Sequence, residues 1–192
     1  MKAFIILGNT RAKSNTEALA DVFAEALAAK GINVSKVSLR EKNIQTCVGC
    51  ERCHSIPDSF GCGIKDDMPE IANEILASDL IVFASPIYTW LPTPPLKAVM
   101  DRIYAFAKFP EDAECFNLLK NQKFAMITTC FDNCEENCDL FDETIRRMAN
   151  FAKISYLGHI AARDSEDGFV IGQEVINEAE NFAEKCAIAL RG

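Results

Sequence analysis

The sequence predicts an α/β protein with a doubly wound, five-stranded parallel sheet of strand order 2-1-3-4-5 and helices on both faces. Three observations lead to this prediction. Five short apolar runs alternate with five segments whose apolar residues recur at helical spacing. In such an alternation each connecting helix must bury its apolar stripe against the sheet, so both faces are covered. The chain also has 192 residues, 49% of them hydrophobic, which suits a globular domain.

The strands and helices are expected to follow one another in strict order. The first strand covers residues 3–7, and the first helix follows Ser14, which stands at capping-box spacing from Glu17. The other strands are expected at residues 34–39, 80–84, 124–128 and 154–161. The other helices are expected from near Asp67, from near Pro94, over residues 141–152 and over residues 175–190. We expect a single domain over residues 1–192, with a cysteine-rich loop insertion at about residues 40–66.

The charge balance argues against two classes of partner. The chain carries 28 Asp and Glu against 20 Lys and Arg, for a net charge of -8. Nucleic acids and acidic membrane surfaces are bound by concentrated positive charge, so we expect no nucleic acid and no membrane as a partner. The apolar run near Met1 is too short for a secretory signal, and no run reaches membrane-spanning length. We therefore expect a cytoplasmic protein.

The loop between the first strand and the first helix is a candidate anion site. In a sheet of this order, ligands bind beyond the carboxyl ends of the first and third strands. Residues 8–16 join a strand to a helix N-terminus, where unpaired amide groups and the helix dipole favour an anion. Walker and dinucleotide-binding loops require glycines that this loop lacks. An ordinary capped helix remains the alternative. The side chains suited to a phosphate are those of Thr10, Arg11, Ser14, Asn15 and Thr16.

A second loop follows the third strand. Residues 85–95 are stiffened by several prolines and carry Tyr88 and Trp90 at the edge of the sheet where this fold binds its ligand. A flat heteroaromatic ring could stack against these side chains. The alternative is that the two aromatic residues belong to a rim or an oligomer contact.

Nine cysteines are unusual in a chain of this length, and in a reducing compartment they indicate thiols or ligands more than disulfides. Cys47, Cys50 and Cys53 are spaced by two residues, and Cys62 follows at a distance. This spacing allows an iron-sulfur cluster, whereas zinc sites prefer paired ligands. Thiols without a cluster, or a redox pair, remain an open alternative. We interpret the nearby His54 as a solvated loop histidine.

Three further cysteines follow the fourth strand, namely Cys130, Cys134 and Cys138. If their segment is helical they share one face. We interpret them as ordinary thiols, because Asp132 and the glutamates at positions 135 and 136 would raise their pKa values.

The combined motifs resemble a known family. Gly8-Asn-Thr-Arg-x2-Ser-Asn-Thr16, Ser85-Pro-Ile-Tyr88 and Leu96-Lys97 leading to Asp101-Arg102 are similar to the flavodoxin-fold NAD(P)H-dependent FMN reductases. The cysteine run before Lys65-Asp-Asp-Met68 resembles their iron-sulfur flavoprotein branch. The resemblance implies a flavodoxin-like domain with FMN as cofactor and NAD(P)H as co-substrate. A [4Fe-4S] cluster on Cys47, Cys50, Cys53 and Cys62 is one alternative that it implies. The residues that it implies around FMN are Asn9, Thr10, Arg11, Ser14, Asn15, Thr16, Pro86, Ile87, Tyr88, Trp90 and Thr129.

The resemblance also implies a function. We expect an FMN-dependent NAD(P)H oxidoreductase that passes electrons to a small acceptor such as a quinone or a flavin. No catalytic side chain is expected, because the chemistry belongs to the flavin. The alternative is a non-catalytic or iron-sulfur-assisted electron-transfer flavoprotein that docks a redox protein. We further expect a homodimer or higher homo-oligomer. The four cysteines of residues 47–62 should converge beside the flavin, because their loop starts at the carboxyl end of the second strand.

Overall fold

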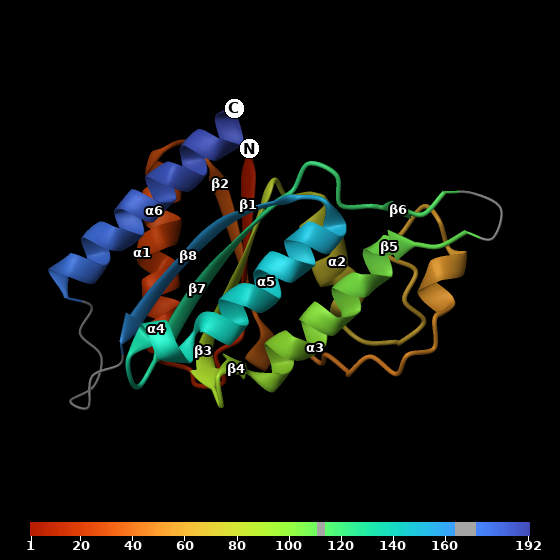
Figure 1. Cartoon of the computed structure of the whole chain (residues 1–192), viewed down its shortest axis with the longest axis horizontal. Coiled ribbons are helices and arrows are strands. Elements are labelled where there is room, and N and C mark those ends of the chain that lie inside the picture. Colours follow the sequence, from red (N-terminus) through yellow and green to blue (C-terminus); the bar gives the residue numbers. More distant parts are fainter. Residues whose placement is uncertain (111–113, 164–171) are drawn as a thin grey trace.

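A computed structural model describes residues 1–110, 114–163 and 172–192. Its central sheet has the order β2-β1-β3-β7-β8, and these five strands are all parallel (Figure 1). The predicted fold class is therefore confirmed, and the order along the sheet is the predicted 2-1-3-4-5. The strands are β1 (Lys2–Leu7), β2 (Asn33–Ser38), β3 (Leu80–Tyr88), β7 (Lys123–Cys130) and β8 (Ser155–Arg163).

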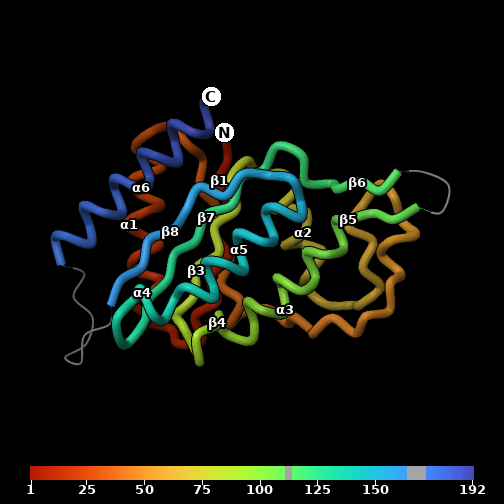
Figure 2. The backbone as a smooth tube through the Cα atoms, viewed as in Figure 1, coloured from red at the N-terminus to blue at the C-terminus, as the bar shows by residue number. Residues whose placement is uncertain are grey.

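The helices cover both faces of this sheet, as the trace in Figure 2 shows. On one face lie α1 (Asn15–Ala29) and α6 (Gln173–Arg191), which share one cluster of buried side chains. On the other face lie α2 (Met68–Leu76), α3 (Pro94–Ile103) and α5 (Asp139–Ala152), which share a second cluster. A short helix, α4 (Cys134–Asn137), precedes α5. No helix of the described ranges is both long and apolar enough to cross a membrane.

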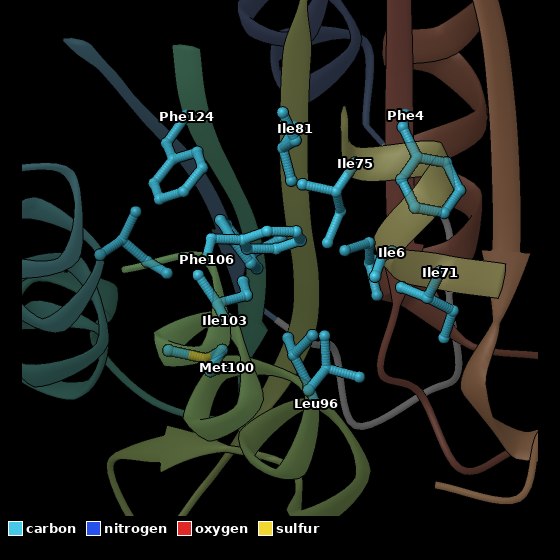
Figure 3. Close-up of a cluster of buried hydrophobic side chains, with 14 of the residues drawn as sticks. Phe4, Ile6, Ile71, Ile75, Ile81, Leu96, Met100, Ile103, Phe106 and Phe124 are labelled. Atoms are coloured by element: carbon cyan, nitrogen blue, oxygen red, sulfur yellow. The ribbon is translucent and has the colours of Figure 1, made fainter. Parts of the chain in front are cut away.

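The alternation of side chains along β1 connects the two clusters. Phe4 and Ile6 point to the face of α2 and α3, where they meet apolar residues such as Ile71 and Leu96 (Figure 3). Ala3, Ile5 and Leu7 point to the face of α1 and α6. Because both faces of the strand are buried, β1 is apolar throughout from residue 3 to residue 7. Each fully buried Phe or Ile contributes about 1.5–3 kcal/mol of transfer free energy.

The end of β3 differs from the prediction. Residues 85–88 were expected in a loop, but β3 continues to Tyr88 and turns back into β4 (Leu91–Pro92), which pairs antiparallel with it. Thr89 and Trp90 form the two-residue turn with φ values of 50° and 62°. Both residues of such a tight hairpin turn need positive φ. Neither is Gly, Asn or Asp, so the usual sequence signal for this turn is missing.

Two other segments differ from their predictions. Residues 129 and 130 were expected beyond the end of the fourth strand but belong to β7. The hairpin of β5 (Ala107–Lys108) and β6 (Phe116–Asn117) was not predicted, because strands of two residues are too short to produce an alternating pattern. The predicted cysteine-rich insertion contains only two short 3-10 turns, Leu39–Glu41 and Arg52–Ser55, within the described chain. The division into one domain over residues 1–192 stays a prediction.

Candidate functional site

A cavity of about 290 Å³ lies at the carboxyl ends of β1, β3 and β7. It is lined by ten of the eleven residues predicted to surround FMN, all except Trp90. They are Asn9, Thr10, Arg11, Ser14, Asn15, Thr16, Pro86, Ile87, Tyr88 and Thr129. We call this cavity the phosphate-loop cavity. Lys13, Cys130 and Phe131 also line it and were missed by the sequence prediction, although Lys13 lies within the predicted loop. Cys130 ends β7 and Phe131 follows it, beyond the predicted end of that strand.

The N-terminus of α1 forms one wall of this cavity. Ser14 is the N-cap, with extended backbone, and its Oγ accepts a hydrogen bond of 3.1 Å from the amide of Glu17. The predicted capping position is therefore confirmed. Because Ser14 is a hydroxyl residue, it keeps its own O–H available as a donor. Further amides of the first helical turn have no partner within the helix and favour a negative charge.

Gly8 allows the close approach that shapes the base of the loop. Its amide donates to the carbonyl oxygen of Ala84 at 2.7 Å, and the hydroxyl of Thr93 donates to the Gly8 carbonyl at 2.6 Å. A Cβ at Gly8 would lie 2.8 Å from the Cβ of Leu96. Only glycine therefore lets α3 begin directly against this loop.

The charges around the loop favour an anion. Arg11 and Lys13 are exposed and line the cavity. Glu17 is the only acidic residue in the first turn of α1, and its carboxylate is already engaged. It accepts hydrogen bonds from Arg40 Nη1 at 3.1 Å and from Asn9 Nδ2 at 3.0 Å. The cavity is therefore locally positive in a chain whose net charge is -8.

Asn9 carries an unsatisfied acceptor at this site. The residue is 1% exposed, and its Nδ2 donates to the carbonyl of Arg11 at 2.8 Å and to Glu17. Both partners are acceptors, so the orientation of the amide group follows from the hydrogen bonds. Among the described residues, nothing donates to Asn9 Oδ1. A buried polar atom in a cavity wall needs a partner, which a ligand hydroxyl or a water can supply.

Of the two aromatic residues predicted for the site, only one lines the cavity. Tyr88 lines the cavity, and its hydroxyl lies 3.1 Å from Oγ1 of Thr10. Trp90 does not line it but stands 52% exposed in the turn between β3 and β4. A contact of Trp90 with a bound ring stays a prediction.

The four cysteines of residues 47–62 line a second, smaller cavity of about 110 Å³, together with the end of α3. We call it the cysteine cavity. The four residues therefore share one cavity. Within the described ranges, however, no group of three or more Cys, His, Asp or Glu side chains is arranged to hold a metal ion.

The two cavities share no lining residue. Thr93 at the start of α3 contacts the phosphate loop, whereas Asp101 near the end of α3 lines the cysteine cavity. Asp101 lies eight positions after Thr93, or about 12 Å further along the helix axis. The segment that carries these cysteines thus runs past the far end of α3 and the β5–β6 hairpin (Figures 1 and 2), and the cysteines do not line the phosphate-loop cavity; their place beside a flavin stays a prediction.

Two buried cations hold the cysteine segment in place. Arg102, 1% exposed, forms an ion pair with Asp66 and donates from Nη2 to Cys62 Sγ at 3.4 Å. Burial alone would raise the pKa of Asp66, but hydrogen bonds from Arg102 and from the amides of Gln45 and Met68 lower it below its usual value. Because Arg102 also binds the carbonyl of Gln45 at 3.2 Å, it connects both ends of the segment to α3.

Lys108 is the second buried cation, with no exposed surface. Its Nζ donates to the carbonyl of Cys53 at 2.8 Å, and no carboxylate pairs with it in the described part of the chain. Burial lowers the pKa of Lys108 and raises the pKa of the Cys53 thiol, while each group counteracts the shift of the other. Lysine side chains are seldom fully buried in folded proteins. Nothing in the sequence of the short strand β5 predicts that Lys108 is one of them.

The environment of His54 differs from the prediction. It was expected to be solvated, but it is half-buried and its Nδ1 lies 2.9 Å from the carbonyl oxygen of Ala107. Its ring packs edge-on against Tyr104 and Phe109, with centroids 4.9 Å and 4.8 Å away. Tyr104 lies in a 3-10 turn after α3, whereas Ala107 and Phe109 belong to or follow β5, which the sequence did not predict.

The third cysteine group does not lie on one helix. Cys130 ends β7, Cys134 begins α4, and Cys138 follows α4. The sulfur atoms of Cys130 and Cys134 are in contact at 2.8 Å. The pKa of Cys138 is raised to about 11, first by burial and then by Cys134 and Asp142. The predicted direction is therefore confirmed for Cys138, but the carboxylates named from the sequence are not its main cause.

Comparison with known proteins connects this geometry to a family. Residues 1–133 match the family described as NADPH-dependent FMN reductase. An iron-sulfur flavoprotein of Archaeoglobus fulgidus is 33% identical over 110 residues, which make up 57% of this chain and 49% of that protein. One from Methanocaldococcus jannaschii is 34% identical over 102 residues, 53% of this chain and 51% of that protein. The chain thus spans about half the length of the curated relatives it matches.

Solved structures share the fold. An NAD(P)H:quinone oxidoreductase from Methanothermobacter marburgensis superposes with a TM-score of 0.68 and 16% identity, covering 97% of both chains. A flavodoxin from Streptococcus pneumoniae TIGR4 superposes with a TM-score of 0.61 and 15% identity, covering 98% of this chain and 99% of its own. At these identities the likeness shows a flavodoxin-like fold alone. The family match covers more than half of the residues, and the chain belongs to the NADPH-dependent FMN reductase family.

Proposed function

We propose that this protein is an FMN-dependent oxidoreductase that takes electrons from NAD(P)H and passes them to a small acceptor such as a quinone or a flavin. The observation that carries the proposal is the phosphate-loop cavity, in which a helix N-terminus, a positive charge and a short aromatic hairpin meet at the carboxyl edge of the sheet. This is the place where an open α/β sheet binds its ligand. Family membership supports the same proposal.

The residues present fit the phosphate and sugar parts of FMN. Arg11, the Ser14 hydroxyl and the amides at the start of α1 are donors that would hold a phosphate. A ribityl hydroxyl is a donor, which is what the buried Oδ1 of Asn9 lacks among the described residues. Lys13 adds a second positive charge at the rim.

The ring part would lie along β3 and its hairpin. Pro86, Ile87 and Tyr88 line the cavity on one side and Thr129 on the other. The contact between Thr10 and Tyr88 holds the tyrosine ring at the rim, where it would limit access of water. Bound FMN would supply the chemistry, since it accepts a hydride and returns electrons singly or in pairs. The role of the chain is to bind and orient, so no side chain is assigned as acid or base.

A [4Fe-4S] cluster on Cys47, Cys50, Cys53 and Cys62 stays a prediction. The four thiols line one cavity, but as arranged they do not fit a cluster, because no three potential ligands in the described residues are positioned to hold a metal. Cys47 and Cys50 are exposed, so the segment would have to move to bring them inward. We assign no electron-transfer step to this group.

A second candidate function is electron transfer to a redox protein. The similarity to proteins named iron-sulfur flavoproteins favours it, as does the acidic net charge of -8, which would attract a basic partner. In that case reduction by a protein donor should be fast and bleaching by NADH or NADPH slow.

We also propose a homo-oligomer, through the exposed aromatic residues near α3 and α5. Tyr104 and Phe151, 49% and 56% exposed, have ring centroids 6.0 Å apart and line an open cavity of about 700 Å³. A second copy would cover this apolar face. Light scattering of protein eluted from a size-exclusion column should give a multiple of the chain mass. The Phe151→Glu variant should elute with the mass of the monomer.

The deciding experiment is the absorption spectrum of protein purified without oxygen. Bound flavin that is bleached within seconds of adding NADH or NADPH supports the reductase. Protein that takes up no FMN on titration contradicts it. Iron and acid-labile sulfide assays on the same sample, with Cys50→Ser as comparison, test the cluster. Absence of both elements after anaerobic reconstitution would exclude it without affecting the flavin assignment.

A further inference from the structure

We propose that Cys130 and Cys134 form a redox-active dithiol that exchanges two electrons with flavin in the phosphate-loop cavity and reduces small disulfides. The proposal rests on the proposed function, because it requires FMN reduced by NAD(P)H. Its starting point is a contact: the two sulfur atoms lie 2.8 Å apart. A disulfide bond is about 2.05 Å long, so the sulfurs need to approach by less than about 1 Å.

The pair stands between two cavities. Cys130 is 3% exposed and lines the phosphate-loop cavity beside Thr129. Cys134 is half-buried and lines a different cavity of about 430 Å³, together with His159 and the α6 residues Glu178 and Phe182. One sulfur therefore borders the flavin site and the other borders a space that a small disulfide could enter from solvent.

The local backbone favours a disulfide that is easily reduced. Only three residues separate the two cysteines, and they lie in the turn from β7 to α4. A disulfide that closes so short a loop gains little stabilisation from loop closure, so it is easily reduced. Cys138 does not compete for the same role, because its Sγ donates to the carbonyl of Cys134 at 2.6 Å and its pKa is raised to about 11.

The proposed reaction has two steps, a thiol–disulfide exchange and a reduction of the protein disulfide by the flavin. A low-molecular-weight disulfide exchanges with the dithiol: its S–S bond breaks, a Cys130–Cys134 bond forms, and two small thiols leave with the two protons. Reduced FMN then supplies two electrons and one proton, solvent supplies the second proton, and the protein disulfide opens to two thiols. The flavin is left oxidised and is reduced again by NAD(P)H. The sum is one NAD(P)H, one proton and one disulfide consumed for one NAD(P)⁺ and two thiols.

The first arm of the test maps the bond. FMN-loaded protein is incubated without oxygen with oxidised glutathione, blocked with N-ethylmaleimide and digested with trypsin and an Asp-specific protease. Cleavage after Lys123 and before Asp132 and Asp139 places Cys130 on one fragment and Cys134 with Cys138 on another. We expect these fragments to be linked and fragment sequencing to place the bond on Cys134. Unlinked fragments at all glutathione disulfide concentrations would overturn the proposal.

The second arm measures the exchange with flavin. NADPH or NADH is added to the oxidised holoprotein, and the linked fragment is quantified again. We expect it to disappear in the FMN-loaded protein and to persist in protein stripped of FMN. If the flavin bleaches while the fragments stay linked, the dithiol proposal is overturned and the proposed function stands. If the flavin does not bleach, both are contradicted.

Matched variants complete the test. Cys134→Ser and Cys134→Ala should both abolish the linked fragment and the consumption of glutathione disulfide, with flavin bleaching retained. Cys138→Ser should keep the link, because serine preserves the donor to the Cys134 carbonyl. Cys115→Ser replaces an exposed cysteine elsewhere and serves as control. A link that survives in Cys134→Ser but not in Cys138→Ser would overturn the assignment of the pair.

Discussion

The hydroxyl groups of Thr16 and Thr129 meet at 2.8 Å, although the two residues are 113 positions apart in the chain. Each residue is 1% exposed. Thr16 lies in the first turn of α1 and Thr129 near the end of β7, so this hydrogen bond connects two walls of the phosphate-loop cavity. This bond therefore helps to hold the N-terminus of α1 against the end of β7, beside the apolar contacts of the two elements.

Replacing either threonine by valine should destabilise the protein. Thr16→Val or Thr129→Val leaves the other hydroxyl buried without its partner, which costs about 1–3 kcal/mol of unfolding free energy. The double variant should cost less than the sum, because both polar groups are then removed. Urea unfolding measures all three. Thr144→Val is the control, because this half-buried threonine of α5 donates only within its own helix, to the Leu140 carbonyl; strictly additive losses would argue against the pair.

Arg11→Ala and Ser14→Ala should each weaken FMN binding by about 1–3 kcal/mol, since each removes a donor to the phosphate. Ser14→Ala should in addition lower the unfolding free energy by about 1 kcal/mol through loss of the helix cap. Titration of apoprotein with FMN, followed by flavin fluorescence, measures the affinities. Arg147→Ala removes an exposed arginine of α5 as control. Unchanged affinity in both site variants would refute the phosphate assignment.

Trp90 is the only tryptophan, so its emission reports on one position. If the turn between β3 and β4 lies against the bound ring, FMN should quench this emission. Equal emission of apoprotein and holoprotein would place Trp90 outside the flavin contacts, in line with its absence from the cavity lining. Tyr88 would keep its predicted role in that case.

Gly8→Ala should destabilise the protein by about 1–3 kcal/mol, the usual cost of forcing a methyl group into a packed interior. The new Cβ would meet the Cβ of Leu96, which belongs to α3 and cannot move alone. Gly172→Ala is the matched control, because a Cβ there meets no atom within 4 Å among the described residues. Thermal unfolding of both variants measures the difference in stability. Equal unfolding midpoints of the Gly8→Ala and Gly172→Ala variants would show that α3 can shift to make room.

The ion pair of Asp66 and Arg102 should contribute to stability in a pH-dependent way. The pKa of Asp66 is lowered in the folded protein, so its contribution is complete above the ordinary Asp pKa of about 3.9 and is lost as the pH falls through the lowered value. Asp66→Asn should remove this part of the acid dependence. Arg102→Met leaves a buried carboxylate without its partner and should cost about 3–5 kcal/mol. Urea unfolding between pH 3 and 7 tests this, with the exposed Glu143→Gln as control; an unchanged acid slope in Asp66→Asn would contradict it.

Much of the architecture could be predicted because its physical causes are local. The apolar run at residues 3–7 needs burial on both faces, and Ser14 caps α1 through an amide three residues away. The candidate site could be predicted in part for the same reason. Residues 9–16 form one continuous loop, so the strand before it and the helix after it bring its donors together.

Other features depended on the tertiary structure. Sequence alone determined the five strands of the main sheet and its five long helices, which loops reach the carboxyl edge of the sheet, and which side chains could bind a phosphate. Only the fold decided that the cysteine cavity lies at the far end of α3, that Lys108 is buried against the Cys53 carbonyl, and that Cys130 and Cys134 touch. The hydrogen bond from Lys108 to the Cys53 carbonyl connects residues 55 positions apart. The contact between the sulfur atoms of Cys130 and Cys134 depends on the geometry of a short turn. Neither cause produces a periodic pattern along the chain, because packing between distant segments and turn geometry set both.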